Sequence, residues 1–357
     1  MNIVIRVDSA EEIGTGHLLR CLTLAEKLRQ RECSVSFICR KLNGNVNKLI
    51  LERKFTLYEI DSASTNSIPT WYKKYWKTDA EATINIIEKY AILIDLLIVD
   101  HYDLDYKWER LLKSFVNKIM VIDDLANRRH ECQLLLDQNY KMDYKNKYDL
   151  LVPNKCKLLL GTNYLLIRDE FIKYKNSLKV RDGDINRILV FFGGTDPTRE
   201  TLKTLHALMT FERNWEVDVI VGRTNPEKKR IKKLCCQVEQ YNYYSQVNNI
   251  SYFMKNADLA IGAGGATTWE RCFMGLPSIT FIVANNQKEV TRAVDNFGAT
   301  INMGENVTEE MIVEKVETLI QYPNLVRKMS EQAIKLVKQE QIKNDLVIKE
   351  ISSLIYS

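Results

Sequence analysis

The chain has 357 residues and a formal net charge of +5. That length fits two domains of a hundred-odd residues each rather than one. The basic residues are spread along the chain, which argues against a dedicated nucleic-acid surface. The amino terminus shows no signal pattern, and no uninterrupted apolar run reaches the ~18 residues that a membrane span requires. We therefore expect a cytoplasmic protein with neither a nucleic-acid nor a membrane partner.

The cysteines and histidines do not form a metal-binding pattern. None of the eight cysteines lies in a C-x-x-C pair, and no two of the four histidines are four residues apart. The D-x-D segments at 103–105 and 182–184 have a spacing that some metal-dependent sugar transferases use, but the pattern is too short to predict a site. We expect reduced thiols, no metal and no cofactor.

The chain begins with a predicted strand, a glycine loop and a helix. The apolar run at 3–7 predicts a buried strand, and apolar residues at helical spacing predict a helix over 18–28. Gly14-Thr15-Gly16-His17 lies between them. A loop in this position can present backbone N–H groups and a helix amino terminus to an anion. The alternative interpretation is a loop that only turns the chain, with His17 as a capping residue.

The rest of the first half alternates strands with helices. We predict strands over 34–39, 93–99 and 118–122, and a loop over the polar and aromatic stretch 62–76. Because sequential strands separated by helices pair through crossover connections, this alternation predicts a parallel sheet.

Polar residues follow the strand over 93–99 at the point where it ends. Asp100, His101 and Tyr102 come directly after it. The carboxyl ends of parallel strands meet at one edge of a sheet, where open α/β sheets bind ligands. We therefore expect these side chains to point to the same edge as His17. Alternatively, Asp100 caps the following helix and His101 is a packing residue.

The second half repeats the beginning of the first half. After a polar segment at 174–186 that we predict to be a linker, a strand over 187–192 runs into a GGTDP loop at 193–197, and a helix follows. Two segments with the order strand, glycine loop and helix, one at the beginning of each half, indicate an α/β fold of two Rossmann-like domains that face each other across a cleft.

These repeats also suggest where the domains begin and end. We place an amino-terminal domain at 1–180 and a carboxyl-terminal domain at 181–335. The last segment, 336–357, has a helical pattern and can pack back across the domains.

A second glycine turn carries a stronger sign of a nucleotide than the first. A strand over 259–261 leads to Gly264 and Gly265, and a helix begins near Ala266. Glu270 lies about one turn into that helix, so its carboxylate can reach a ligand bound at the helix start. This carboxylate would repel phosphate but could accept two hydrogen bonds from a ribose diol. The alternative is an ordinary helix start at which the macrodipole favours Glu270.

Six segments carry a family resemblance, and they occur in the family's order along the chain. They are RVDSAEEIGTGHLLRCLTLA (6–25), IVDHYDLD (98–105), VIDDLANRRHECQLLLDQN (121–139), LLGTNYLLIRDEF (159–171), VFFGGTDPT (190–198) and GAGGATTWERCFMGLPSI (262–279). On these segments the chain resembles the UDP-2,4-diacetamido-2,4,6-trideoxy-β-L-altropyranose hydrolases of pseudaminic acid biosynthesis. It resembles more distantly the UDP-N-acetylglucosamine transferases of lipid II synthesis.

The resemblance implies a glycosyltransferase-B-like fold, in which the carboxyl-terminal domain holds UDP and the amino-terminal domain holds the sugar. It implies catalytic roles for His17, Tyr102 and Asn286, which match the family's glycine-loop histidine, D-H-Y tyrosine and N-Q asparagine. Many relatives have serine where this chain has Ala266, so backbone N–H groups would have to serve there. The substrate- and UDP-binding positions that it implies are Gly14, Gly16, Gly194, Val247, Ile250, Gly265, Ala266, Thr267 and Glu270.

The implied reaction is hydrolysis of a UDP-linked 2,4-diacetamido-2,4,6-trideoxy sugar to UDP and the free sugar. UDP is a good leaving group whose charge helix amino termini can stabilise, so the main requirement is a base for water. Imidazole takes up a proton near neutral pH. We expect His17 to position or deprotonate a water that attacks the anomeric carbon with inversion and without a metal. Tyr102 and Asn286 would orient the sugar or the water.

Two other functions are compatible with the same residues. A UDP-sugar glycosyltransferase would share the fold and the donor site and would pass the sugar to an acceptor instead of water. A catalytically inactive nucleotide-sugar-binding protein would be expected to lack a base in the first loop, so His17 and Tyr102 count against it. The sequence makes no prediction of the oligomeric state.

Overall fold

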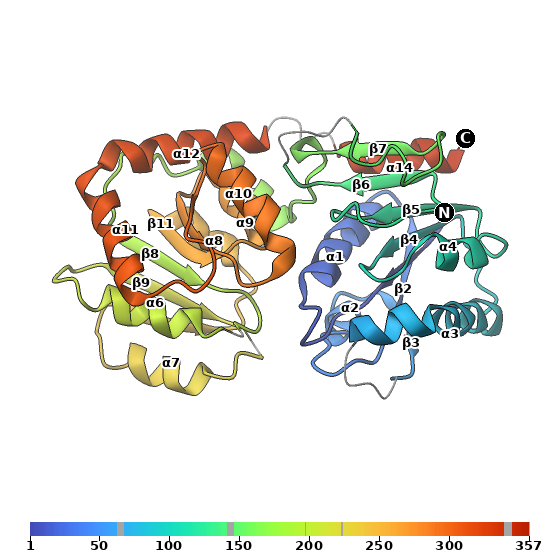
Figure 1. Cartoon of the computed structure of the whole chain (residues 1–357), viewed down its shortest axis with the longest axis horizontal. Coiled ribbons are helices and arrows are strands. Elements are labelled where there is room, and N and C mark those ends of the chain that lie inside the picture. The colour runs from blue at the N-terminus through green and yellow to red at the C-terminus, as the bar shows by residue number, and fades with distance from the viewer. Residues whose placement is uncertain (63–67, 141–145, 197, 223, 339–344, 357) are drawn as a thin grey trace. The chain divides into compact units, whose positions relative to one another are not determined.

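The computed structural model describes residues 1–62, 68–140, 146–196, 198–222, 224–338 and 345–356. The chain divides into two compact units: the first comprises Met1–Asn139, Asp143–Leu166 and Asn344–Ser357, and the second comprises Tyr140–Met142 and Ile167–Lys343. Each unit is built on one parallel sheet, so the predicted α/β fold of two Rossmann-like domains is confirmed (Figure 1). Pro197, part of the predicted GGTDP loop, lies outside the described residues.

The first unit contains a seven-stranded parallel sheet in the order β3-β2-β1-β4-β5-β6-β7. The chain order reverses at β1, which pairs with β2 on one side and with β4 on the other. In open α/β sheets such a reversal marks the crevice where ligands bind. The strands are β1 (Asn2–Val7), β2 (Ser34–Arg40), β3 (Thr56–Ile60), β4 (Leu96–Asp100), β5 (Lys118–Ile122), β6 (Leu134–Asp137) and β7 (Lys157–Leu160).

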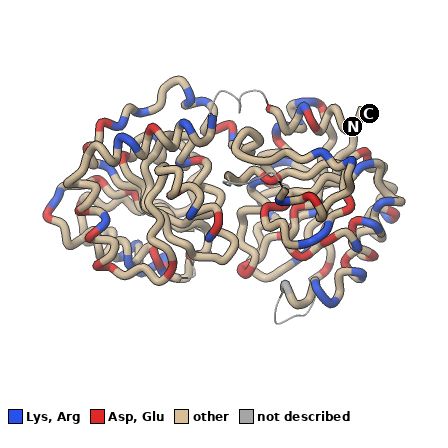
Figure 2. Tube along the Cα trace, turned by 45° about the horizontal axis from the view of Figure 1, so that its top comes forward, with Lys and Arg blue, Asp and Glu red and all other residues tan. Residues whose placement is uncertain are grey.

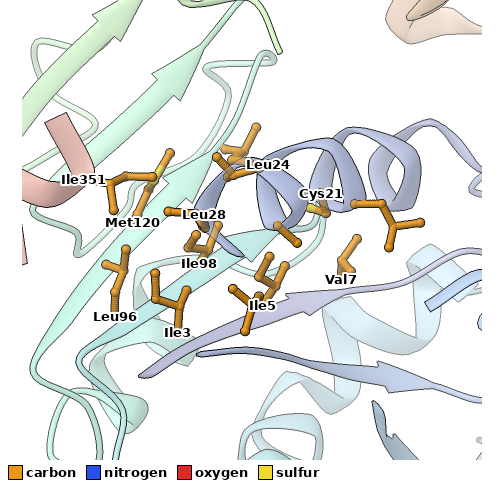
Figure 3. Close-up of a cluster of buried hydrophobic side chains, with 14 of the residues drawn as sticks. Ile3, Ile5, Val7, Cys21, Leu24, Leu28, Leu96, Ile98, Met120 and Ile351 are labelled. Atoms are coloured by element: carbon orange, nitrogen blue, oxygen red, sulfur yellow. The ribbon is translucent and has the colours of Figure 1, made fainter. Parts of the chain in front are cut away.

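Alternate residues of β1 pack on opposite faces of this sheet, as the period of a strand requires. Ile3 and Ile5 lie in one buried cluster with Leu28 of α1, and Val4 lies in a separate cluster. The predicted helix over 18–28 is confirmed within α1, whose apolar side chains face β1 (Figure 3). The helices of the first unit are α1 (Gly16–Arg29), α2 (Lys48–Glu52), α3 (Ile68–Lys89), α4 (Tyr106–Leu112), η1 (Thr162–Tyr164) and α14 (Leu346–Tyr356).

The loop predicted over 62–76 is wrong from Ile68 onward, where α3 begins. The stretch has no regular apolar period, and non-helical φ/ψ angles at Tyr75 interrupt the helix. Tertiary contacts stabilise it, because buried Tyr72 and Asp79 accept hydrogen bonds from Arg6 Nη2 at 3.1 and 2.9 Å. Arg6 lies far away in the sequence, so no local pattern could reveal these contacts. Residues 63–67 lie outside the described part of the chain.

The second unit contains a six-stranded parallel sheet in the order β10-β9-β8-β11-β12-β13. Its order reverses at β8, between β9 and β11, as the order of the first sheet reverses at β1. The strands are β8 (Arg187–Phe191), β9 (Glu216–Val221), β10 (Tyr241–Ser245), β11 (Leu259–Ala263), β12 (Ser278–Phe281) and β13 (Ile301–Asn302).

Helices follow the strands of the second unit, and apolar residues of several of them share a buried core with β8, β9, β11 and β12. The helices are α5 (Asp169–Ile172), η2 (Lys175–Ser177), α6 (Glu200–Leu208), α7 (Lys228–Cys235), α8 (Ile250–Asn256), α9 (Thr267–Phe273), η3 (Asn285–Gln287), α10 (Lys288–Asn296), α11 (Glu309–Gln321) and α12 (Pro323–Val337).

The polar segment at 174–186 is anchored to the second unit by Arg181. Its guanidinium donates to the carbonyls of Met254 (2.9 Å) and Ala257 (3.1 Å) at the end of α8. It also donates to those of Met274 (2.8 Å) and Gly275 (3.0 Å) after α9. Carbonyls at helix ends lack intrahelical donors, so one buried arginine satisfies two helix termini. Burial lowers the pKa of Arg181 to about 10, against the opposing charge of Asp258.

The carboxyl-terminal segment contributes to both units. Helix α12 belongs to the second unit, whereas α14 belongs to the first. Val347, Ile348 and Ile351 of α14 are buried in the cluster that contains β1 and α1, and Ile351 lies beside Met120 (Figure 3). Among the described residues, no helix has the length and apolar character needed to cross a membrane. Lysines and arginines occur over both units in Figure 2.

Candidate functional site

His17 lies at the carboxyl edge of the first sheet, in the first turn of α1, and is only 6 % exposed. The loop before it turns sharply: the N–H of Gly14 donates to the carbonyl of Ala10 at 2.8 Å, and Gly14 has φ of 80°. That positive φ favours glycine. In the sheet, Val7 of β1 is paired with Asp100 of β4. The crossover from β1 therefore brings His17 to the end of β4.

His17 forms a short hydrogen bond with Asp100. The distance from Nδ1 to Asp100 Oδ1 is 2.5 Å, and the carboxylate is fully buried. A carboxylate at this distance places the proton on Nδ1, which leaves Nε2 as the acceptor. Burial alone would raise the pKa of Asp100, but Arg20 and His17 more than offset it and hold the pKa of that carboxyl well below its usual range. Asp100 is therefore a permanent anion behind the imidazole.

Arg20 connects the ends of two strands through the carboxylates of Asp100 and Asp124. Its Nε and Nη2 donate to the two oxygens of Asp100, both at 2.6 Å, and its Nη1 donates to Asp124 after β5 at 3.0 Å. A fork of this kind fixes the plane of a carboxylate. Arg20 thereby orients Asp100 toward His17. The sequence interpretation missed this arginine, although it follows His17 at i+3 and so shares a helix face with it.

Tyr102 contacts His17, whereas His101 does not contact it. The rings of Tyr102 and His17 lie edge to face with centroids 4.3 Å apart. The ring of His101 faces the other way: its Nδ1 accepts from the N–H of Asp103 at 3.0 Å, and its Nε2 lies 3.4 Å from Asp8. His101 is thus a packing residue, as the alternative interpretation proposed.

The alternative interpretation of Asp100 as a helix cap is wrong. Helix α4 is capped by Asp105, which accepts from the N–H of Lys107 at 2.9 Å. Asp100 ends β4 and is occupied by His17 and Arg20. In the D-H-Y segment, Asp100 and Tyr102 therefore contact the His17 imidazole, whereas His101 packs in the core.

A buried ionic cluster supports this edge from inside the unit. Arg6 donates to Asp8 at 2.5 and 2.9 Å, and Tyr72 also donates to Asp8. Burial would raise the pKa of Asp8, yet Arg6 and His101 hold the pKa of that carboxyl well below its usual range. Asp8 follows β1 directly, so the cluster fixes the start of the loop that leads to His17. The sequence interpretation missed this cluster because its members meet only in the fold.

The turn between β11 and α9 contains two glycines with different structural requirements. A Cβ on Gly264 would lie 2.1 Å from Thr291 Oγ1, so packing against α10 explains this glycine. A Cβ on Gly265 would meet its nearest neighbour, Gln287 Nε2, at an ordinary 3.5 Å. Ala266 is exposed and precedes α9, and half-buried Thr267 is its first residue. Packing therefore explains why position 264 is glycine, whereas the fold does not require glycine at position 265.

Glu270 is held by an arginine that the sequence interpretation did not identify. Arg168 Nε donates to Glu270 Oε1 at 2.7 Å, and Nη2 donates to Oε2 at 2.9 Å. Arg168 Nη1 also pairs with Glu170 at 2.6 Å. The Glu270 carboxylate is thus fixed in one plane at the first turn of α9. Each of its oxygens keeps a further lone pair for another donor.

The other predicted positions of the second unit follow the carboxyl ends of its strands. Gly194 follows β8, and its carbonyl accepts from Thr224 Oγ1 at 3.1 Å. Val247 and Ile250 follow β10, with Ile250 buried at the start of α8. Asn286 lies in η3 after β12. Because the strands are parallel, these loops share one edge of the sheet with the turn at Gly265.

No group of three or more histidine, cysteine, aspartate or glutamate side chains in the described ranges could hold a metal ion. All eight cysteines are free thiols.

The two Rossmann-like units define an α/β protein of glycosyltransferase-B-like fold. Residues 188–346 match the model of the glycosyltransferase family 28 C-terminal domain. The crystal structure of MurG from Acinetobacter baumannii superimposes with a TM-score of 0.61 at 14% identity, over 98% of this chain and 99% of that one. This likeness shows the fold.

Curated proteins confirm the resemblance predicted from the motifs. The chain is 28% identical over 262 residues to UDP-2,4-diacetamido-2,4,6-trideoxy-beta-L-altropyranose hydrolase from Campylobacter jejuni, covering 73% of this chain and 84% of that protein. It is 25% identical over 295 residues to an uncharacterized protein from Methanocaldococcus jannaschii. That match covers 81% of this chain but only 57% of the archaeal protein, so the chain spans a little over half of that relative's length.

Proposed function

We propose that this protein hydrolyses a UDP-linked 2,4-diacetamido-2,4,6-trideoxy sugar and releases UDP and the free sugar with inversion at the anomeric carbon. The observation that carries the proposal is the 2.5 Å hydrogen bond between His17 Nδ1 and Asp100 Oδ1. It leaves Nε2 as a proton acceptor, which activation of water requires. The choice of sugar rests on the similarity to the Campylobacter jejuni hydrolase.

In the proposed reaction, the water oxygen forms a bond to the anomeric carbon while the bond from that carbon to the diphosphate oxygen breaks. The electron pair of the broken bond stays on the diphosphate, and a proton of the water goes to His17 Nε2. The buried anion of Asp100 stabilises the imidazolium that forms. Tyr102 and Asn286 orient the sugar or the water.

The second unit binds UDP in this proposal. The turn at Gly265, Ala266 and Thr267 binds the diphosphate with backbone N–H groups, and Glu270 accepts hydrogen bonds from the ribose diol. Val247 and Ile250 contact the uracil. The match of residues 188–346 to a glycosyltransferase C-terminal domain supports a sugar-nucleotide donor site in this unit.

Proton NMR with the purified protein and UDP-2,4-diacetamido-2,4,6-trideoxy-β-L-altropyranose tests the proposal. We expect UDP and the free sugar to appear without an added acceptor, and the sugar to have the inverted anomeric configuration at first. The variant His17→Asn should fold normally and lose about 10²–10⁴-fold in turnover, the usual contribution of a general base. The control His206→Asn removes a partly exposed histidine that pairs with Glu309 in the second unit, and it should keep full turnover. Near-normal turnover in a folded His17→Asn would refute the assignment.

Asp100 is a positioning residue in the same proposal, and a pH profile separates that role from a structural one. Asp100→Asn should lower turnover strongly and change the pH dependence of kcat, because the imidazole loses the anion that fixes its tautomer. A matched control is Asp105→Asn, since asparagine also caps helices and α4 should remain intact. A folded Asp100→Asn enzyme with an unchanged pH profile would contradict the role.

A UDP-sugar glycosyltransferase is the second candidate, and the match to glycosyltransferase family 28 favours it. The two activities differ in one measurement. Release of UDP at full rate without an acceptor supports hydrolysis. Release that depends strictly on an added acceptor supports transfer.

A further inference from the structure

Arg271 is a buried cation that hydrogen-bonds the turn between β11 and α9. Its side chain is 2% exposed. Nη2 donates to the carbonyl of Ala263 and to Thr268 Oγ1, both at 3.0 Å, and Nη1 donates to Thr267 Oγ1 at 3.1 Å. All three acceptors are neutral, and they flank the turn: Ala263 ends β11, and Thr267 and Thr268 begin α9. The guanidinium is thus bound to the segment that the proposed function assigns to the diphosphate.

Arg271 forms no ion pair with an aspartate or glutamate of the part of the chain that the structure describes. Within the described ranges, no aspartate or glutamate oxygen lies within 4.0 Å of the Arg271 guanidinium, and Nε has no hydrogen-bond acceptor. The neighbouring Glu270 is engaged by Arg168 instead. Burial lowers the pKa of Arg271 to about 10, although the charges of Cys272 and Glu270 act in the opposite direction.

The buried arginines of the chain differ in their partners, because Arg181, like Arg271, donates to neutral acceptors, whereas Arg6 has acidic ones. Arg6, also fully buried, pairs with Asp8 at 2.5 Å and with Asp79 at 2.9 Å. A buried charge without a partner is costly, and a neutral side chain could satisfy the same three acceptors with less loss of solvation. Arg181 satisfies the carbonyls of two helix ends, whereas Arg271 bonds Thr267 of the proposed diphosphate turn, so the cost of burying Arg271 falls at that turn.

We propose that Arg271 is the cationic element of the diphosphate-binding site, and that an incoming nucleotide diphosphate supplies the negative charge that Arg271 lacks in the free protein. The inference rests on the proposed UDP site and adds the residue that sets its preference for charge. Arg271 acts through the turn, because its hydrogen bonds go to Thr267, Thr268 and Ala263.

Thr267 provides the link between the buried charge and the ligand. Its hydroxyl oxygen accepts from Arg271, so its own O–H is directed away and can donate to a phosphate oxygen. A hydrogen bond from a cation strengthens the donor beyond it. This hydroxyl takes over the contact that serine would make at position 266, where this chain has Ala266. In hydrolysis the leaving diphosphate gains a further negative charge, so the same field favours departure of UDP.

Affinities for uridine, UMP and UDP, measured by calorimetry with the full chain, test the proposal. The three ligands share the base and the ribose and differ in charge. For Arg271→Gln we expect little change in the affinity for uridine. We expect a loss of affinity that grows by about tenfold for each added phosphate, the size of a Coulomb term at a partly screened site. Arg271→Lys should restore part of the difference. The control Arg327→Gln removes an exposed arginine of the same unit that bonds Asn324, and it should leave all three affinities unchanged.

The outcomes separate this inference from the proposed function. If the wild-type protein binds none of the three ligands, the UDP site itself is wrong. If the wild-type protein binds them and Arg271→Gln loses affinity equally for uridine and for UDP, Arg271 only maintains the fold and the inference is overturned. Should Arg271→Gln fail to fold, Thr267→Val keeps the arginine and removes the link. That variant should weaken the binding of UDP at least several-fold more than that of uridine, and an equal effect on both affinities would overturn the inference.

Discussion

Gly14 and Gly16, two residues apart in the loop before His17, differ in what the fold requires of them. Gly14 has φ of 80°, whereas Gly16 begins α1, and a Cβ at Gly16 would meet nothing within 4 Å. The protein itself therefore gives no reason for glycine at position 16. The proposed function gives a reason, because a sugar or diphosphate that approaches the backbone would require glycine there.

Gly16→Ala should leave the free energy of unfolding unchanged or slightly raised, because alanine favours a helix start more than glycine does. It should lower turnover of the UDP-sugar by at least tenfold, since the added methyl group occupies space that the sugar or diphosphate needs. Gly14→Ala is the matched comparison and should destabilise by about 1–2 kcal/mol through its positive φ. Thermal unfolding and initial rates measure both effects. Full turnover in Gly16→Ala would show that no ligand approaches this loop.

The candidate site was predictable from the sequence only where a residue lies close to its motif. His17 follows a glycine loop and Tyr102 follows a strand end, so the topology of a parallel sheet was enough to place them at one edge, and the family resemblance selected them as candidates. Arg168 and Arg271 were not selected, because their roles depend on contacts with Glu270 and Thr267 that only the folded chain shows. A carboxylate can be expected near a ribose, but the arginine that orients it cannot be read from spacing.

At the scale of single elements, strands and amphipathic helices were predicted well and α3 was not. The strand and helix over 3–7 and 18–28 have strong apolar periods, which survive in β1 and α1. Helix α3 is held by Arg6, and Trp108 Nε1 donates to Asp79 within it at 3.0 Å. Buried polar contacts of this kind leave no periodic trace in the sequence.

Arg181 holds the ends of α8 and α9 together, so its loss should act on both elements. Arg181→Met leaves the carbonyls of Met254, Ala257, Met274 and Gly275 without their buried donor. We expect the second unit to lose about 2–4 kcal/mol of its free energy of unfolding, a usual cost for orphaned buried polar groups. Urea unfolding measures the change.

Val180→Ala is the control, because Val180 is 89% exposed beside Arg181 in the same segment. It should unfold like the wild-type protein. An Arg181→Met protein as stable as this control would mean that water replaces the arginine at both helix ends.

At the scale of the whole molecule, the two units differ in how they use buried carboxylates. Asp8, Asp100 and Asp123, all in the first unit, have pKa values held below the usual range. In each case burial would raise the pKa, and a neighbouring arginine, Arg6, Arg20 or Arg128, reverses the effect. Asp137 of the same unit behaves oppositely, because burial raises its pKa despite Lys147. In the second unit, the described carboxyl whose pKa is lowered is the fully exposed Glu310.

Because folding lowers the pKa of these three aspartates of the first unit, we predict that acid unfolds the first unit selectively. A carboxyl whose pKa is lower in the folded than in the unfolded state stabilises the fold above its ordinary pKa of about 3.9, and this contribution is lost as pH falls below that value. At pH 3 each such aspartate has lost about 1 kcal/mol, or about 3 kcal/mol for the three together, and Asp137 opposes part of it. Hydrogen exchange at pH 7 and pH 3, corrected for the intrinsic exchange rates, measures the stability of each sheet.

We expect the protection factors of β1, β4 and β5 to fall by about two orders of magnitude between these pH values, while those of β8 and β11 change much less. The variant Asp123→Asn provides an internal control, because a side chain that cannot titrate should flatten the pH dependence of the first unit without altering that of the second. Equal loss of protection in both sheets would show that general charge repulsion, rather than these aspartates, governs acid stability. Because the pKa of Asp100 stays well below its usual range while the first unit is folded, Asp100 should remain the anionic partner of His17 until that unit unfolds.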